Sequence, residues 1–504
     1  MNQVLRSDIR SLTAEHAGVL ILGLAVVLRL LNLGGTSLWY DEGIYLLNSQ
    51  GSFAELIHNT QTQNSSPIGF PFLLWLIDNT LGLNAFTARL PSAIAGILSV
   101  WVVLSLTKVG ANRAVALIAA LMLAVAPMQI LYAQEVREYA FSILASAVIL
   151  WAYLAAYNQG RILPLIVALC VAPWFSYGAC FTALAALVSL AGARLFQPID
   201  VQWRAVGAAF LAFVVSLVLV YLSFAQYQMY TGEVWYLQEH YLAQSGLNPV
   251  VWLVLNSGGV LLASLPGLLA VVVIPILLAI YYFRYVRAPL EITKEPLLLI
   301  FLVLFGGLIA GGILEVYPFG SPRHSVFVGP VMAAAAARVI YLLYQAHSPK
   351  PFIWGGVGAL ALLFVSAGFS LSQSNIGKGL HPALDKVLSV NVYGEYEDNR
   401  SLFSWAREKA DEGLTLYASP GCKPSNALYG QGLDVTVAPF RMLGDPESYA
   451  ESIFAELETA PIALLFSATV PGEARQVKTL LEAKGVNVSI DFEGTRVVGL
   501  VVTP

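Results

Sequence analysis

Residues 88–107 read ARLPSAIAGILSVWVVLSLT, and residues 113–131 read RAVALIAALMLAVAPMQIL. A helix rises 1.5 Å per residue, so each of these apolar runs is long enough to cross a hydrocarbon core of about 30 Å. Only the polar segment 108–112 separates them. The stretch therefore predicts two neighbouring transmembrane helices. The same pattern predicts about eleven spans in total, at 17–34, 88–107, 113–131, 140–157, 162–178, 179–196, 205–225, 250–283, 297–314, 323–345 and 352–371.

The composition agrees with a membrane protein and excludes several other classes. Of the 504 residues, 57% are hydrophobic and 12% are charged, whereas soluble domains carry about 25% charged residues. The formal net charge of −4 leaves no basic excess for binding nucleic acid. The three cysteines, Cys170, Cys180 and Cys422, lack metal-ligand spacing, and Cys422 has no mate in its segment. Neither a zinc cluster nor a disulfide framework is expected.

Charged residues become frequent from about Gly377 onward. We therefore expect a polytopic α-helical membrane domain at 1–375, with a long outside loop at 35–87, and a C-terminal soluble α/β domain at 376–504. In the C-terminal part, helical patterns alternate with short apolar strands, which predicts a parallel or mixed sheet. The helices are expected at 396–412, 446–459 and 472–485, and the strands at 414–418, 434–438, 462–467, 486–492 and 496–502. Because no glycine-rich phosphate loop is present there, a structural or acceptor-docking role is expected.

The distribution of Lys and Arg among the short loops predicts the orientation. With the N-terminus in the cytoplasm, the outside loops hold three basic residues, Arg89, Arg137 and Arg323. The inside loops then hold Arg6, Arg10, Lys108, Arg113, Arg161, Arg194, Arg204, Arg284, Arg287, Lys294 and Lys350. This asymmetry places loop 35–87 and the C-terminal domain outside the cytoplasm, at the plasma (inner) membrane. If the proline-containing run 250–283 formed two helices, the C-terminal domain would change sides.

The first span is expected to remain in the protein as a signal anchor, because no small-residue cleavage pattern follows it. Directly after it, Trp39-Tyr40-Asp41-Glu42-Gly43 opens the first outside loop. An aspartate flanked by aromatic rings near the hydrocarbon boundary suits a general base. Two acids at the beginning of a solvated loop are the simpler interpretation of the same residues. The aromatic and proline-rich pieces from Phe53 to Gly82 are expected to lie along the membrane interface.

A second polar cluster, Tyr132-Ala133-Gln134-Glu135-Val136-Arg137-Glu138-Tyr139, lies between two apolar runs. Charges beside a span are costly and tend to mark function. If the next helix began here, Gln134 and Glu138 would share one face, and Glu135 would share a face with Tyr139. Acid, amide and aromatic groups would then point into one cavity. A helix-end ion pair among Glu135, Arg137 and Glu138 is the structural alternative.

A third cluster, Tyr317-Pro318-Phe319-Gly320-Ser321-Pro322-Arg323-His324, precedes the tenth span. The planar guanidinium of Arg323 suits a phosphate, because it binds two oxygens in charge-assisted hydrogen bonds. His324 exchanges a proton near neutral pH. Snorkelling of Arg323 toward lipid headgroups is the structural alternative. Arg29 and Arg89 also lie near the outer surface, where each suits a lipid phosphate.

Together these clusters resemble the glycosyltransferase family 39 branch of the GT-C membrane glycosyltransferases, which includes protein O-mannosyltransferases and aminoarabinose transferases. The matching stretches are Leu38-Trp39-Tyr40-Asp41-Glu42, Ala88-Arg89-Leu90-Pro91-Ser92 and 132–140, with a weaker match at Pro322-Arg323-His324. Family members usually carry a His-Pro-Pro element in the first outside loop, where this chain has Ser65-Ser66-Pro67-Ile68. That departure bears on the sugar or metal preference, and His58 lies too far upstream to replace the missing histidine.

The resemblance implies transfer of a hexosyl or pentosyl group from a polyprenyl-phosphate donor on the outer side of the membrane, with inversion at the anomeric carbon. Such a reaction needs a base for the acceptor hydroxyl and cations for the departing phosphate. We assign the base to Asp41, and Glu42 is expected to orient either Asp41 or the sugar. The expected binding residues for the donor and acceptor are Gln134, Glu135, Arg137, Glu138, Tyr139, Arg89, Arg323 and His324.

No cofactor is identified from the sequence. A divalent ion held by outside carboxylates is compatible with it, but no ligands are assigned. The acceptor is left open among a lipid, a polysaccharide and a protein hydroxyl. The rival interpretations are a flippase or transporter for lipid-linked sugars and a membrane receptor. Transporters usually place ionisable groups and broken helices near the bilayer midplane, whereas here the charges gather at the outer ends of the expected spans.

Overall fold

The computed structural model describes residues 2–228, 235–266, 289–346, 398–439, 442, 445–457, 461–467, 472–494 and 496–503. The chain separates into two compact units. The first comprises Met1–Leu33, Ser52–Leu76 and Arg89–Val390, and the second comprises Gly34–Gly51, Ile77–Ala88 and Asn391–Pro504. The expected outside loop 35–87 is therefore shared between the units, and its opening segment belongs with the C-terminal residues.

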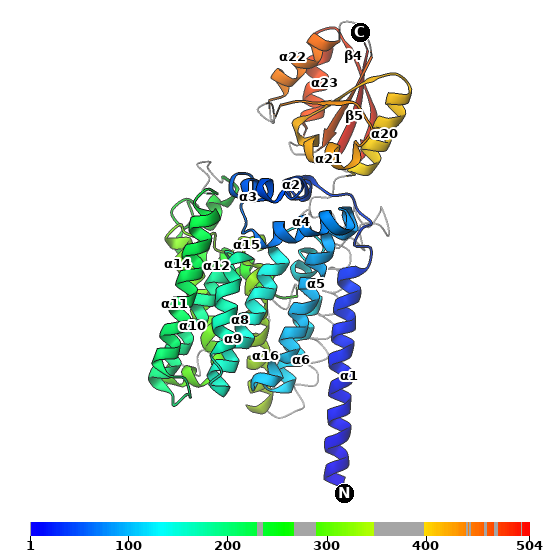
Figure 1. The fold of residues 1–504 in the computed structure, drawn as a ribbon. Helices are drawn as coiled ribbons and strands as arrows, with labels where there is room; N and C mark the ends of the chain where they lie inside the picture. Colours follow the sequence, from blue (N-terminus) through cyan, green and yellow to red (C-terminus); the bar gives the residue numbers. More distant parts are fainter. Residues whose placement is uncertain are drawn as a thin grey trace. The chain divides into compact units, whose positions relative to one another are not determined.

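The first unit is a bundle of apolar helices (Figure 1). Its helices are α1 (Asn2–Leu30), α3 (Phe53–Thr62), α4 (Gly69–Leu81), α5 (Ala85–Leu104), α6 (Arg113–Val125), α7 (Pro127–Leu131), α8 (Tyr139–Gln159), α9 (Leu163–Val171), α10 (Ala179–Phe196), α11 (Trp203–Val220), α12 (Pro249–Ser264), α14 (Pro296–Ile313), α15 (Pro322–Ser325) and α16 (Gly329–Ala346). The C-terminal end of α4 and the N-terminal end of α5, within Ile77–Ala88, belong to the second unit. The multi-span helical fold expected from the sequence is confirmed.

Within the described residues, six helices are long and apolar enough to cross a membrane: Ala85–Val109, Tyr139–Gln159, Ala179–Phe196, Trp203–Ala225, Pro296–Ile313 and Pro322–Leu342. Four shorter apolar helices lie at His16–Leu30, Arg113–Val125, Leu163–Trp174 and Pro249–Ser264. Each of the first ten expected spans thus overlaps an apolar helix. The eleventh, 352–371, and the second half of the eighth, 267–283, lie outside the described residues.

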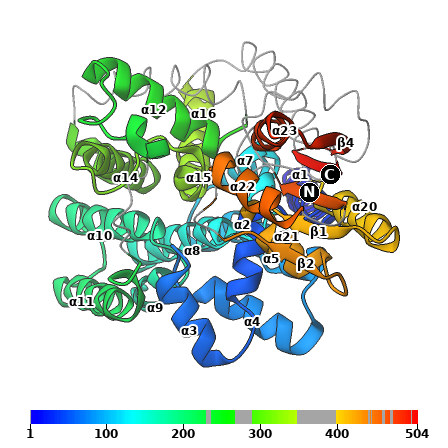
Figure 2. The same cartoon turned by 90° about the horizontal axis from the view of Figure 1, so that it is seen from above.

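Small side chains explain the close packing at the centre of this bundle. Helix α16 carries the buried run Ala333–Ala337 and packs on α6, which is also rich in buried alanine. In a membrane, small residues let helix backbones approach and gain van der Waals contact. Seen from above, α10 lies beside α8, α11 and α14 (Figure 2). Helix α11 exposes Phe210, Leu211 and Val215, an apolar face that suits lipid rather than water.

The expected interfacial pieces of the first loop are helical. Helices α3 and α4 run across the direction of the long helices (Figure 1). Helix α3 begins with a capping box, because the Ser52 hydroxyl accepts the N–H of Glu55 and the Glu55 carboxylate accepts the N–H of Ser52. Gln228 connects the end of this helix to the bundle by donating to the carbonyl oxygens of Thr60 at 2.6 Å and Ser66 at 2.8 Å.

The second unit contains a five-stranded mixed sheet in the order β2-β1-β3-β5-β4. Strand β1 pairs in parallel with β2 and β3, whereas β5 is antiparallel to β3 and β4. The strands are β1 (Thr415–Ala418), β2 (Val435–Val437), β3 (Ile462–Ser467), β4 (Asn487–Gly494) and β5 (Val497–Thr503), and the helices are α2 (Tyr40–Asn48), α20 (Asn399–Asp411), α21 (Lys423–Tyr429), α22 (Pro446–Glu456) and α23 (Glu473–Ala483). All five expected strands are present. The short helix α21 was not expected, since seven residues are too few to show a helical period.

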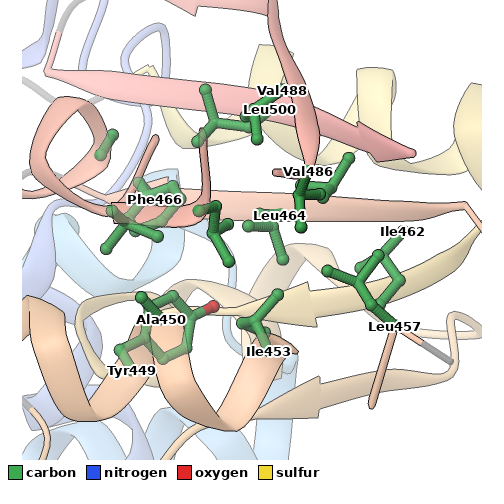
Figure 3. Packing of buried hydrophobic residues seen from close by; sticks show 14 residues of the cluster. Tyr449, Ala450, Ile453, Leu457, Ile462, Leu464, Phe466, Val486, Val488 and Leu500 are labelled. Carbon is green, nitrogen blue, oxygen red and sulfur yellow. The ribbon is translucent and has the colours of Figure 1, made fainter. Parts of the chain in front are cut away.

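Two hydrophobic clusters cover the faces of this sheet. On one face, Tyr449 and Ile453 of α22 pack toward Leu464 and Phe466 of β3 (Figure 3). On the other, Phe403 and Trp405 of α20 pack with Ala463 and Leu465. Because both faces are covered, β3 is buried at every position, which explains why its sequence IALLFS is nearly continuously apolar.

Candidate active site

The two acids of the first cluster lie in the first turn of α2, in the second unit. Helix α2 begins at Tyr40, so Asp41 and Glu42 occupy its second and third positions. The Glu42 carboxylate is fully buried and accepts the backbone N–H of Trp39 at 3.2 Å. Glu42 therefore caps the helix that carries Asp41. Asp41 is half-buried, and backbone N–H groups of the first turn point toward its end of the helix.

The second cluster is not the beginning of a helix, so the prediction of shared helical faces at 134–139 is wrong. Helix α8 begins at Tyr139, and residues 132–138 form an irregular turn after α7. Pro127 begins α7 after the kink at Ala126, and this short helix ends at Leu131. The Ser92 hydroxyl on α5 donates to the carbonyl oxygen of Arg137 at 3.1 Å and so attaches the turn to a neighbouring helix.

Arg137 is held by the residues that follow it in this turn. Its Nη2 donates to the Tyr139 hydroxyl at 3.1 Å, and its guanidinium carbon lies 5.2 Å from the centre of the Tyr139 ring. Its Nε lies 3.8 Å from the Glu138 carboxylate. The expected structural ion pair is therefore present, and a cation stacked on an aromatic ring adds to it. Only 11% of the Arg137 side chain is exposed, so its charge acts in a region of low dielectric.

The third cluster meets the second at the Tyr139 ring. The His324 ring lies 6.4 Å from the Tyr139 ring and 6.3 Å from the Tyr317 ring, edge to face in both cases. Nδ1 of His324 is 2.8 Å from the Ser321 hydroxyl, and the Tyr317 hydroxyl donates to the His324 carbonyl oxygen at 2.9 Å. Segments that lie far apart in the sequence thus form one group around three aromatic rings.

Charges of both signs surround this group. Arg137, Arg323 and His240 lie within electrostatic range of His324. Tyr132 contacts Tyr139 with ring centres 4.8 Å apart. Burial, and next the nearby charge of Glu135, raises the pKa of the Tyr132 hydroxyl. We call Arg137, Arg323, His324, Tyr132 and Tyr139 the cationic cluster. Arginine side chains beside neutral phenols can hold a phosphate without competition from an ionised tyrosine.

His240, near His324, was not predicted as a site residue from the sequence. This histidine ends the short 3₁₀ helix Trp235–His240, and its Nδ1 is 2.7 Å from the amide oxygen of Asn256 on α12. Asn256 is buried and donates to the Glu239 carbonyl oxygen at 3.3 Å. Nothing in the sequence connects His240 with His324, because the proximity depends on how α12 packs against α15.

Other expected binding residues contact the backbone. Gln134 is buried, and its Nε2 donates to the carbonyl oxygens of Leu28 at 3.1 Å and Leu31 at 3.4 Å, at the end of α1. Arg89 is buried and donates from Nη1 to the Leu33 carbonyl oxygen at 3.1 Å.

Arg29 is buried as well. It donates to the carbonyl oxygens of Leu123 and Ala124, each at 3.1 Å, where α6 ends. A cation there interacts favourably with the helix dipole.

Within the part of the chain that the structure describes, no three His, Cys, Asp or Glu side chains are arranged to hold a metal ion.

The bundle of apolar helices, with a polar and aromatic cluster beside the beginning of a span, defines a multi-span membrane protein of the kind expected from the sequence. Residues 65–224 match the family model described as dolichyl-phosphate-mannose-protein mannosyltransferase. The resemblance to the GT-C membrane glycosyltransferases is confirmed.

Solved structures share this fold over nearly the whole chain. ArnT from Cupriavidus metallidurans bound to undecaprenyl phosphate has a TM-score of 0.56 and 15% identity, with 96% of this chain and 97% of ArnT covered. The apo state of the same protein has a TM-score of 0.54 and 15% identity, with the same coverage. The archaeal oligosaccharyltransferase AglB from Archaeoglobus fulgidus, in complex with an inhibitory peptide and a dolichol-phosphate, has a TM-score of 0.51 and 14% identity, with 94% of this chain and 71% of AglB covered. No curated protein matches the sequence.

Proposed function

We propose that the protein is a membrane glycosyltransferase that moves a sugar from a polyprenyl-phosphate donor to an acceptor hydroxyl. The cationic cluster carries this proposal, because it combines two arginines and a histidine with aromatic rings at the beginning of two spans. Such a site suits a phosphate that leaves with negative charge and a sugar that stacks on an aromatic face. The match over 65–224 and the shared fold with lipid-phosphate-bound ArnT support the same reaction class.

In the proposed step, Asp41 takes the proton of the acceptor hydroxyl, and the acceptor oxygen attacks the anomeric carbon. The bond from that carbon to the phosphate oxygen breaks as the new glycosidic bond forms. A single displacement of this kind inverts the configuration. The electron pair of the broken bond stays on the polyprenyl phosphate, whose charge is stabilised by Arg137, Arg323 and His324. Glu135 and Glu138 bind sugar hydroxyls, and Glu42 keeps the helix of Asp41 in place.

The proposal extends to topology. About eleven spans, a cytoplasmic N-terminus and transfer on the outer side of the membrane follow from the positive-inside pattern of the sequence. The acceptor is a lipid, polysaccharide or protein hydroxyl that is presented on that side.

The experiment uses the full chain reconstituted in liposomes with a panel of radiolabelled polyprenyl-phosphate hexoses and pentoses and a membrane extract as acceptor. Transfer of label from one donor class identifies the reaction, and the labelled product identifies the acceptor. Movement of the intact labelled lipid across the bilayer, without transfer from any donor, would overturn the proposal in favour of a flippase.

A further inference from the structure

The second unit joins the beginning of the first outside loop to the C-terminal sheet, and the contacts centre on Leu38. The N–H of Leu38 donates to the Tyr429 hydroxyl at 2.7 Å, and its carbonyl oxygen accepts from Nδ2 of Asn399 at 3.1 Å. Both polar groups of this peptide position are thus bonded by side chains that come from α20 and α21. Leu38 and Asn399 are both buried, so these bonds are protected from water.

Arg400 fixes the residues just before Leu38. Its backbone N–H donates to the Ser37 hydroxyl at 3.0 Å, and its Nη2 donates to the Gly34 carbonyl oxygen at 2.9 Å. Segment 34–38 therefore lies along the beginning of α20. A chain that served only as a covalent connection would not need several of its polar groups bonded by the C-terminal helices α20 and α21.

Helix α2 itself is in close contact with α21. A Cβ atom added at Gly43 would lie 2.5 Å from Cβ of Pro424, which is closer than two carbon atoms can approach. Glycine at position 43 is therefore required by the packing of the two helices. Gly43 follows Asp41 by two positions, so this contact and the bonds to Leu38 fix α2 on both sides of its acidic turn.

We propose that Asn399, Pro424 and Tyr429 are positioning residues for Asp41: the C-terminal unit sets the place of the helix turn that carries the general base. This inference rests on the proposed function, and it assigns the C-terminal residues a part in the reaction beyond acceptor docking. Misplacing a reacting group by about 1 Å can cost on the order of 100-fold in rate. The positioning residues therefore act on the rate of the chemical step and leave donor binding unchanged.

The first test is Tyr429→Phe in the full reconstituted chain. We expect kcat to fall about 10- to 100-fold, with the KM for the donor unchanged. The moles of donor bound per mole of protein are measured in the same samples and should equal those of the wild type. The matched control is Tyr417→Phe, because the Tyr417 hydroxyl on β1 donates to the exposed Glu456 carboxylate of α22 at 3.1 Å, and this variant should keep the wild-type kcat. A loss of bound donor in proportion to kcat would mean lost folded protein and would overturn the inference.

The second test uses the close contact. Gly43→Ala should lower kcat, and adding Pro424→Gly should restore at least fivefold of the loss, because it removes the atom that the new methyl group meets. If adding Pro424→Gly does not restore kcat, the contact between Gly43 and Pro424 does not set the position of Asp41. The rate of backbone hydrogen exchange at residues 36–45 gives a readout that is independent of activity. Tyr429→Phe should raise this exchange rate.

The outcomes separate the two proposals. Transfer by the wild type, loss in Asp41→Asn and full activity in Tyr429→Phe would overturn the positioning inference alone. Absence of transfer by the wild type would overturn both.

Discussion

The guanidinium of Arg137 stacks on the ring of Tyr139, with 5.2 Å between its central carbon and the ring centre, while its Nη2 donates to the hydroxyl of the same tyrosine at 3.1 Å. The arginine therefore remains in one orientation before any ligand arrives. A cation fixed in advance costs little reorganisation when charge develops on a leaving phosphate.

Arg137→Lys should separate charge from geometry. Lysine keeps the charge but lacks the planar fork and the stacking on Tyr139. We expect kcat/KM for the polyprenyl-phosphate donor to fall about 10- to 100-fold, or about 1.4–2.8 kcal/mol. Arg161→Lys, on the segment between α8 and α9, is the control and should leave transfer unchanged. Equal kinetics for the two variants would remove Arg137 from the phosphate site.

Ser321→Ala should affect the donor site through His324. The hydroxyl of Ser321 is 2.8 Å from Nδ1 of His324, and a bond of this kind is worth about 0.5–1.5 kcal/mol. We expect donor affinity to fall about twofold to tenfold, measured by titration with the donor lipid. The control is Ser404→Ala, since the exposed Ser404 hydroxyl donates to the Arg400 carbonyl oxygen one turn earlier in the same helix. If Ser321→Ala bound the donor with wild-type affinity, the orientation of the His324 ring would have no part in donor binding.

Gln134→Leu tests whether this amide binds substrate or stabilises the fold. Removing the amide leaves the buried carbonyl oxygen of Leu28 and the partly buried carbonyl oxygen of Leu31 without this donor, at a cost of about 1–3 kcal/mol. We expect a lower midpoint of thermal unfolding in detergent, with an unchanged donor KM at low temperature. An unchanged midpoint of unfolding together with a raised donor KM would show that Gln134 binds substrate rather than stabilising the fold.

Asp491 makes stability of the C-terminal unit depend on pH. The hydrogen bond from Nε1 of Trp405, and next that from Lys409, lower the pKa of Asp491 in the folded protein. A carboxyl group with a lowered folded pKa stabilises the fold above its unfolded pKa of about 3.9, and that contribution is lost as the pH falls through the folded value.

Asp491→Ala should therefore lower the hydrogen-exchange protection of α20 at pH 7 by about twofold to fivefold, the range for a partly exposed ion pair. The difference from the wild type should begin to shrink as the pH falls below about 4 and should vanish below the lowered folded pKa of Asp491, where the wild-type carboxyl group is also neutral. Asp434→Ala, at an exposed site before β2, is the control. A difference that grows as the pH falls would contradict the sign of the shift.

The periodic and apolar parts of the fold were predictable, because they depend on local sequence. Runs of apolar residues located the helices around α8 and α10, and the buried strand β3 was recognisable from IALLFS alone. The turn at 132–138 was not predictable, because its polar residues also fit a helical period. Pro127 and the bond from Ser92 to Arg137 favour the irregular path that the structure shows.

The residues that make up the candidate site could be selected from the sequence, whereas the contacts among them could not. Arg137, Tyr139 and His324 were each identified from charge beside a span, and the structure brings them together. Their contacts depend on the packing of distant helices. The bond between Leu38 and Tyr429 joins positions 391 residues apart, and no local pattern indicates it.

The most direct test of the central claim compares Asp41→Asn with Asp78→Asn in single-turnover transfer at saturating donor. Both substitutions remove one carboxylate from loop 35–87, and both residues belong to the second unit. We predict that Asp41→Asn lowers the transfer rate at least 100-fold, in the range of general-base catalysis, with donor binding retained, and that Asp78→Asn transfers at the wild-type rate. Equal rates for Asp41→Asn and the wild type would contradict the assignment of Asp41 as the general base.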